Sequence, residues 1–209
     1  MAIDWSLYLV TDPDLVGGRE NVVRIVKEAV RGGVSVVQLR DKEASDEQIE
    51  HTARELLAVL GNVPLFINDR VEVAEKLGCH LHIGQNDMAF REARGMLSDE
   101  QLIGLSIGNH AELAAISDDA RPDVIGIGPV YSTNTKKNAP AGMGPDAAAA
   151  LARAARERGI DSVAIGGIKD HNAHELAGSD FAGICVVSDI MAAKDPAAAA
   201  ARLKEAFHG

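Results

Sequence analysis

The chain is poor in aromatic residues and in cysteine, and each shortage narrows the range of functions. Phe, Trp and Tyr make up 3% of its 209 residues, so stacking of nucleic-acid bases on aromatic rings is not the expected mode of action. The two cysteines, Cys79 and Cys185, stand in unrelated apolar segments. A disulfide framework is therefore not expected.

Long apolar runs and excess positive charge are also missing. No run reaches the ~18 apolar residues of a membrane span, and residues 1–10 lack the order of a secretory signal. We therefore expect a cytoplasmic protein that does not bind membranes. The formal net charge of -10 also argues against nucleic acid as a partner. Small anionic substrates remain compatible with this charge, because they need only a local group of cations.

What the chain does contain is a repeated alternation of short apolar runs and amphipathic segments. The apolar runs predict strands at residues 7–12, 35–40, 65–69, 80–84, 102–107, 123–128, 162–167 and 181–187. The segments between them predict helices at 19–31, 46–60, 71–77, 89–97, 111–120, 145–158, 172–178 and 196–207, with Asp46 as a helix N-cap.

Strands that alternate with helices indicate a parallel sheet. With no linker and no change of composition along the chain, we predict one domain, residues 1–209, folded as a (β/α)8 TIM barrel. A doubly wound open sheet is the alternative, but no Gly-x-Gly-x-x-Gly motif follows the first strand. In a closed barrel the carboxyl ends of all the strands lie on one face, where active sites form.

Two groups of polar residues at predicted strand ends have the chemistry to bind phosphate oxygens and a metal ion. Gln38, Arg40 and Lys42 alternate after the second strand, and an amide with two cations on one side suits phosphate oxygens. Asp69 and Asp87 follow neighbouring strands, so their carboxylates can share a Mg²⁺ ion. The alternatives are an ordinary charged strand end and strand-end turn residues.

Further candidates lie at the ends of the later strands. The irregular stretch 129–144 holds hydroxyls and lysines, as a loop closing over an anion would, although a solvated surface loop has the same composition. Residues 164–168 and 186–189 end strands seven and eight, and the loops after these strands are a frequent phosphate site in this fold. Ser106 lacks a His–Asp context and is expected to hydrogen-bond a ligand. The histidine pairs have no third zinc ligand at a convincing spacing.

At these positions the chain resembles the thiamine-phosphate synthase family over nearly its whole length. The matching blocks, in order, are 8–12 (YLVTD), 38–42 (QLRDK), 67–69 (IND), 82–87 (HIGQND), 104–106 (GLS), 126–131 (GIGPVY), 133–137 (TNTKK) and 165–168 (IGGI). Many matching blocks in one order are far more specific than any single block.

The resemblance implies an enzyme that joins 4-amino-5-hydroxymethyl-2-methylpyrimidine diphosphate to a thiazole phosphate, forming thiamine phosphate and diphosphate. By position, the implied contacts to the pyrimidine diphosphate are Gln38, Arg40, Lys42, Asn68, Ser106 and Lys136. The implied Mg²⁺ ligands are Asp69 and Asp87. The implied thiazole-phosphate contacts are Thr133, Thr135, Gly167, Val187 and Ser188. Of these, Arg40, Lys42, Ser106 and Lys136 are expected to act in catalysis.

Two other functions remain open on the same barrel. A thiazole tautomerase, which is an isomerase, or a non-catalytic thiazole-phosphate sensor would not need the diphosphate and magnesium residues. The synthase is favoured because its full set is present: Arg40, Lys42, Asn68, Asp69, Asp87 and Lys136. The expected partners are thus small phosphorylated substrates and possible further copies of the chain.

Overall fold

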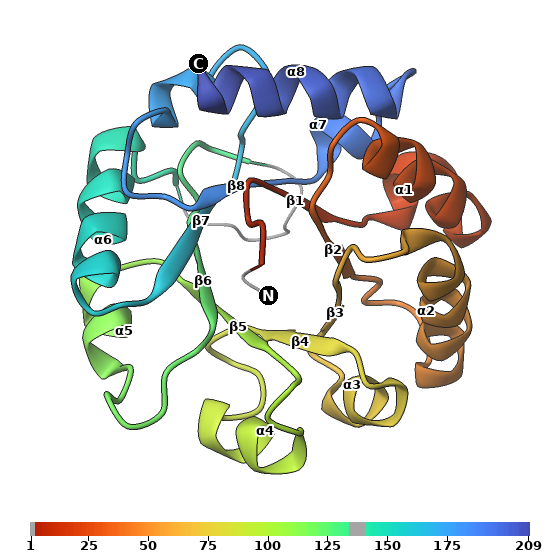
Figure 1. Ribbon diagram of the computed structural model, residues 1–209, viewed down its shortest axis with the longest axis horizontal. Helices are drawn as coiled ribbons and strands as arrows, with labels where there is room; N and C mark the ends of the chain where they lie inside the picture. The colour runs from red at the N-terminus through yellow and green to blue at the C-terminus, as the bar shows by residue number, and fades with distance from the viewer. Residues whose placement is uncertain (1–2, 134–140) are drawn as a thin grey trace.

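A closed parallel barrel forms the centre of the computed structural model, which describes residues 3–133 and 141–209 (Figure 1). Its strands are β1 (Leu7–Val10), β2 (Val36–Leu39), β3 (Leu65–Asn68), β4 (His80–Ile83), β5 (Ile103–Ile107), β6 (Val124–Ile127), β7 (Asp161–Ile165) and β8 (Gly183–Val186). Each strand pairs with the next along the chain, and β8 pairs with β1, where Leu7 lies opposite Ile184. The predicted (β/α)8 barrel is confirmed, and closure excludes the open sheet.

Helices surround the strands on the outside of the barrel (Figure 1). The α-helices are α1 (Val22–Arg31), α2 (Asp46–Leu60), α3 (Val71–Leu77), α4 (Phe90–Met96), α5 (His110–Ala115), α6 (Pro145–Glu157), α7 (Ser188–Met191) and α8 (Pro196–His208). Short 3-10 helices occur at η1 (Pro13–Val16), η2 (Arg19–Asn21) and η3 (Ala173–Leu176).

Two of the helix predictions fail in part. The helix predicted at 172–178 is only the 3-10 turn η3, and the one predicted at 111–120 ends at Ala115. Short segments gain few backbone hydrogen bonds to offset the cost of helix nucleation, so tertiary contacts decide their conformation. Val71–Leu77 is equally short and is helical. The short helix α7, directly after β8, was not predicted.

The N-cap of helix α2 lies one residue before the predicted position. Ser45, not Asp46, is the N-cap: its hydroxyl accepts from the backbone N–H of Gln48, and the Gln48 side chain accepts from the N–H of Ser45. This capping box satisfies two backbone donors at once. Asp46 instead lies in the first turn, where its negative charge is favoured by the helix dipole.

Two apolar layers hold the fold together. Outward-facing strand residues such as Leu7 and Leu9 belong to the large core between the strands and the helices. Inside the barrel, Trp5, Tyr8 and Phe66 pack together, with the Tyr8 and Phe66 ring centroids 5.6 Å apart. The barrel interior is therefore built from aromatic as well as aliphatic side chains, since Val36 and Val124 belong to the same cluster.

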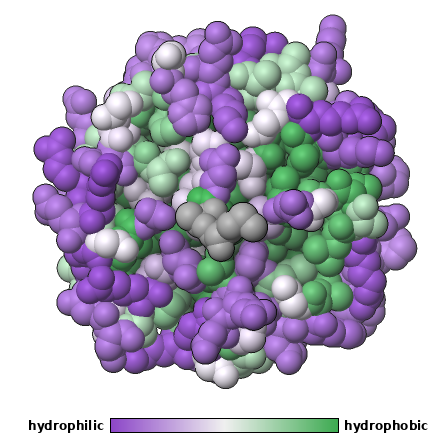
Figure 2. Space-filling model, viewed as in Figure 1, coloured by the Kyte–Doolittle hydropathy of each residue, from purple (hydrophilic) through white to green (hydrophobic). Residues whose placement is uncertain are grey.

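Polar and charged residues dominate the periphery of the face shown in Figure 2, with apolar patches between them. Among residues 3–133 and 141–209, no helix has the length and apolar character of a membrane span.

Strand β8 passes so close to the segment before β1 that only glycine fits at its first position. A Cβ atom at Gly183 would lie 1.8 Å from the backbone oxygen of Trp5. We expect Gly183→Ala to lower the free energy of unfolding by about 1–3 kcal/mol, because backbone must shift to admit the methyl group. Urea denaturation measures this change.

Gly95 in α4 provides the control, since a Cβ atom there meets nothing within 4 Å. Gly95→Ala should leave stability unchanged or raise it by up to ~1 kcal/mol, as expected for glycine replaced within a helix. Equal stability of the two alanine variants would contradict the account of the β1–β8 contact.

Candidate functional site

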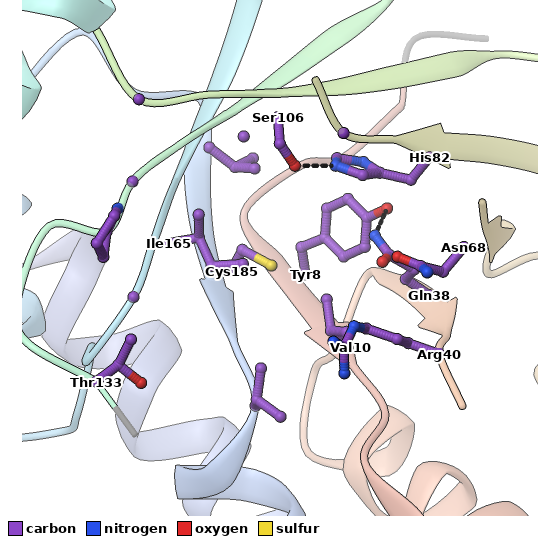
Figure 3. Close-up of a pocket in the computed structure, with 18 of the residues that line it drawn as sticks. Tyr8, Val10, Gln38, Arg40, Asn68, His82, Ser106, Thr133, Ile165 and Cys185 are labelled. Atoms are coloured by element: carbon purple, nitrogen blue, oxygen red, sulfur yellow. Dashed lines mark hydrogen bonds between the residues drawn. The ribbon is translucent and has the colours of Figure 1, made fainter. Parts of the chain in front are cut away.

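A cavity of about 340 Å³ opens among the carboxyl ends of the strands. Most of the sequence-predicted site residues line it: Gln38, Arg40, Lys42, Asn68, Asp69, Asp87, Ser106, Thr133, Gly167, Val187 and Ser188. In Figure 3, Gln38, Arg40 and Asn68 lie on one side of the cavity, and Thr133 lies across from them. The predicted residues Thr135 and Lys136 lie outside the described part of the chain.

The end of β2 supplies an amide and two cations to the cavity. Gln38 is buried, and its side-chain N–H donates to the Tyr8 hydroxyl at 3.0 Å. Burial raises the pKa of Tyr8, so this hydroxyl stays protonated at neutral pH. Arg40 and Lys42 follow beyond the end of the strand, as their spacing predicts, and both line the cavity.

Thr11, at the end of β1, holds the backbone of Arg40 in place. The Thr11 hydroxyl donates to the carbonyl of Arg40 at 3.1 Å and accepts from its N–H at 2.9 Å, and the threonine is fully buried. On the other side, the buried Asp41 accepts from Arg19 at 2.7 Å and from the N–H groups of Glu43 and Ala44. The two cations are thus carried by a loop that is fixed at both ends.

Asp69 and Asp87 lie next to each other at the ends of β3 and β4. The pKa of Asp69 is raised by burial and then by its hydrogen-bond contact with Asp87 and the charge of that residue. The Lys42 ammonium, 3.5 Å from the Asp69 carboxylate, opposes this increase. Two carboxylates that disfavour each other's charge form a place where a cation is stabilised.

The backbone at Asp69 is in the left-handed region, with φ 63°. Aspartate tolerates this conformation better than most residues, although it costs energy. The turn is held by the Asp69 N–H, which donates to the His82 carbonyl at 2.9 Å. Such strain recurs at functional sites, and here it accompanies the approach of the Asp69 carboxylate to Asp87 and Lys42.

His82, set aside in the sequence analysis as one of the histidine pairs, is a site residue, and the expectation that Ser106 has no histidine beside it is wrong. Its Nε2 lies 2.9 Å from the Ser106 hydroxyl (Figure 3), and its Nδ1 is a buried atom without a hydrogen-bond partner among the described residues. Burial lowers the pKa of His82 to about 4, against an opposing effect of Asp87, so the imidazole is neutral at neutral pH. The available signal was its position on β4, which faces the barrel interior.

The loops after β7 and β8 form the opposite side of the cavity. Gly167, with φ 66°, leaves no room for a side chain: a Cβ atom would lie 2.7 Å from the Cβ of Tyr131. The side chain of Asn172 holds this loop, accepting from the Lys169 N–H at 2.7 Å and donating to the Gly167 carbonyl at 3.1 Å. Ser188 begins α7 at the rim of the cavity.

The two described ends of the stretch 129–144 are paired with each other and with β7. Val130 donates from its N–H to the Ile165 carbonyl, and Met143 and Gly144 donate to the carbonyls of Pro129 and Val130. The stretch therefore leaves the barrel and returns to it at one point beside the cavity. Its predicted closure over a ligand depends on residues 134–140, which are outside the described part of the chain.

The arrangement places cations and paired carboxylates on one side of a cavity and a glycine–serine cradle on the other. That geometry suits a substrate with a diphosphate and a metal ion at one end, and a phosphate group at the other. Within the residues described, no group of three or more His, Cys, Asp or Glu side chains could hold a metal by itself. The fold is thus a (β/α)8 barrel whose cavity has the chemistry to bind a phosphorylated small molecule.

Comparison with known proteins gives the family. A sequence profile described as thiamine monophosphate synthase matches residues 7–190. A thiamine-phosphate synthase of Psychrobacter sp. is 42% identical over 199 residues, which cover 93% of this chain and 92% of that protein. The solved structure of thiamine phosphate pyrophosphorylase from Pyrococcus furiosus is similar with a TM-score of 0.78 at 28% identity, over 98% of this chain and 96% of that one. The chain belongs to the thiamine monophosphate synthase family.

Some relatives are much longer. The thiamine biosynthesis multifunctional protein ThiED of Corynebacterium efficiens is 49% identical over 212 residues, which cover 98% of this chain but 29% of that protein. The chain therefore spans less than a third of the length of that relative.

Because His82 is buried in its neutral form, the free energy of unfolding should depend on pH. Its pKa is about 4 in the folded chain against an ordinary value of 6.5, so the unfolded chain takes up the proton first as pH falls. The stabilising contribution is complete above pH 6.5 and is lost on acidification toward pH 4. Between those pH values the free energy of unfolding should fall by roughly 3 kcal/mol more in the wild type than in His82→Gln.

Urea denaturation of both proteins between pH 7 and pH 4 provides the comparison. Carboxylates away from His82 contribute equally to the two acid transitions, so the difference between the proteins reports mainly the imidazole, with Asp87 as its one coupled neighbour. If both lost the same unfolding free energy, His82 would not be a buried neutral group.

Proposed function

We propose that this chain condenses 4-amino-5-hydroxymethyl-2-methylpyrimidine diphosphate with 4-methyl-5-(2-phosphooxyethyl)thiazole, giving thiamine phosphate and diphosphate. The observation that supports this most is the two-sided cavity: Arg40, Lys42 and the carboxylate pair lie on one side, and the loops bearing Gly167 and Ser188 on the other. Family membership supports the same reaction.

The residues at the ends of β3 and β4 fit a magnesium ion. Mg²⁺ is usually held by one or two carboxylates together with substrate phosphate oxygens and water, and Asp69 and Asp87 supply such a pair. When bound, the ion would neutralise charge on the leaving diphosphate. The raised pKa of Asp69 reflects burial and the neighbouring carboxylate, and both effects favour a cation beside it.

Arg40 and Lys42 would bind the diphosphate and stabilise the charge that develops on it. In the proposed reaction the bond between the pyrimidine methylene carbon and the diphosphate oxygen breaks, and its electron pair leaves with the diphosphate. The ring nitrogen of the thiazole then donates its lone pair to the methylene carbon. Because Thr11 and Asp41 hold the backbone that carries these cations, the loop would need little reorganisation to stabilise the leaving diphosphate in the first step. Lys136 would add a further cation from the 129–144 stretch.

The pyrimidine ring would lie among Gln38, Asn68 and Ser106, whose amide and hydroxyl groups can pair with ring nitrogens and the amino group. The attacking thiazole nitrogen carries no proton, so the reaction needs no general base. Neutral His82, bonded to Ser106, orients that hydroxyl and adds no charge to the pocket. Orientation and leaving-group stabilisation would supply most of the rate enhancement.

Incubation of the protein with both substrates and Mg²⁺ tests the proposal, with each component omitted in turn. We expect equal amounts of thiamine phosphate and diphosphate, and only in the complete mixture. Isomerisation of the thiazole substrate without the pyrimidine would instead identify a tautomerase. Binding of the thiazole phosphate with no product in any mixture would identify the sensor.

Removal of either carboxylate provides a sharper test of the metal site. We expect Asp69→Asn and Asp87→Asn each to lower kcat at least a hundredfold at saturating substrates, because an amide keeps the shape but gives the ion no charge. Steady-state assays across a range of Mg²⁺ concentrations measure this effect.

Asp14→Asn serves as the matched control, because Asp14 is exposed and lies outside the cavity lining. It should retain wild-type turnover. Full activity of the Asp69 and Asp87 variants, or of the wild type with excess chelator, would overturn the magnesium assignment.

A further inference from the structure

Lys169, which follows the Gly166–Ile168 turn after β7, makes a contact that no proposed substrate role explains. Its ammonium group donates to the Ser188 hydroxyl oxygen at 2.9 Å and lies 3.3 Å from the Asp189 carboxylate. The side chain is 33% exposed and lies in the neighbouring surface cleft, not among the residues that line the cavity. It therefore reaches the cavity only through Ser188, which borders both.

The direction of this hydrogen bond determines what Ser188 can do. A lysine ammonium has three donors and no acceptor, so the Ser188 oxygen must accept from it. The hydroxyl hydrogen is then free to point elsewhere, and Ser188 lines the cavity. A hydroxyl whose oxygen accepts from a cation is also the stronger donor. The contact thus prepares Ser188 to donate to an anion.

Other contacts fix Lys169 and its partner in this geometry. The N–H of Lys169 donates to the Asn172 side chain at 2.7 Å, and the N–H of Asp170 donates to the Asp189 carboxylate at 3.0 Å. Asp189 therefore accepts from the β7 loop and also pairs with the Lys169 ammonium. The loops after β7 and β8 are joined through this small polar network, with Ser188 at its cavity end.

We propose that Lys169 is a positioning residue for the phosphate group of the thiazole substrate, acting by holding the Ser188 hydroxyl as a donor toward that phosphate. This inference rests on the proposed function. Asp189 offsets the charge of the ammonium group, so the effect is local to Ser188 and does not extend to the diphosphate side of the cavity.

The test compares Lys169→Met with Lys194→Met in the condensation assay. Methionine keeps most of the apolar stem and removes the donor, and Lys194 lines the same surface cleft, so its variant carries the same loss of charge. We expect Lys169→Met to raise the KM for the thiazole phosphate about tenfold, the usual size of a lost charge-assisted hydrogen bond. The KM for the pyrimidine diphosphate should stay that of the wild type, and Lys194→Met should change neither.

A double-mutant cycle with Ser188→Ala then shows whether the lysine acts through the serine. In the Ser188→Ala background, Lys169→Met should have no further effect on the KM for the thiazole phosphate. Lys169→Arg, which restores a donor, should recover most of the affinity. The proposal would be overturned if Lys169→Met left this KM unchanged. It would also be overturned if the change in KM of the double variant equalled the product of the changes in the two single variants.

Titration with inorganic phosphate separates this inference from the proposed function. If the wild type formed no thiamine phosphate, the proposed function would fail. Weaker phosphate binding by Lys169→Met than by Lys194→Met would still support the positioning role. Equal phosphate affinity in the two variants would contradict it, whatever the reaction of the enzyme.

Discussion

The parallel pairing of β1 with β8 is the contact on which the rest of the structure depends. It places Tyr8 opposite Cys185 and Leu9 opposite Val186, and it turns an open sheet into a ring. Only then do the residues at the ends of β2 to β4, with their cations and carboxylates, and the loops after β7 and β8, with Gly167 and Ser188, enclose one cavity. The close passage of Gly183 over Trp5 belongs to the same closure.

The second constraint on the structure is the concentration of charged side chains at one side of the cavity. Burial and Asp87 raise the pKa of Asp69, and Lys42 offsets this only in part. Lys42 thus neutralises the carboxylate pair incompletely, and a divalent cation beside the pair would complete the balance. Buried groups such as Thr11 and Asp41 hold the loop that carries the cations. The backbone of this loop is therefore already ordered in the folded protein, before a ligand binds.

The sequence predicted the barrel and most of its cavity, because strand ends in a parallel barrel meet on one face whatever their separation in the chain. Asp69 and Asp87 were assigned in this way, and the structure brings them together. Hydrogen bonds between distant segments could not be predicted from spacing. Thr11 had no assigned role until its contact with Arg40 was seen, and the contacts of His82 with Ser106 and of Lys169 with Ser188 each depend on the register of neighbouring strands and loops.

The central claim is that metal and diphosphate occupy one side of the cavity together. Calorimetric titration of diphosphate into the protein, with and without Mg²⁺ and corrected for the complex that the two form in solution, tests it most directly. The account predicts that Mg²⁺ raises the affinity for diphosphate at least tenfold, and that diphosphate raises the affinity for Mg²⁺ by the same factor. Diphosphate affinity that is the same with Mg²⁺ and with chelator would contradict it.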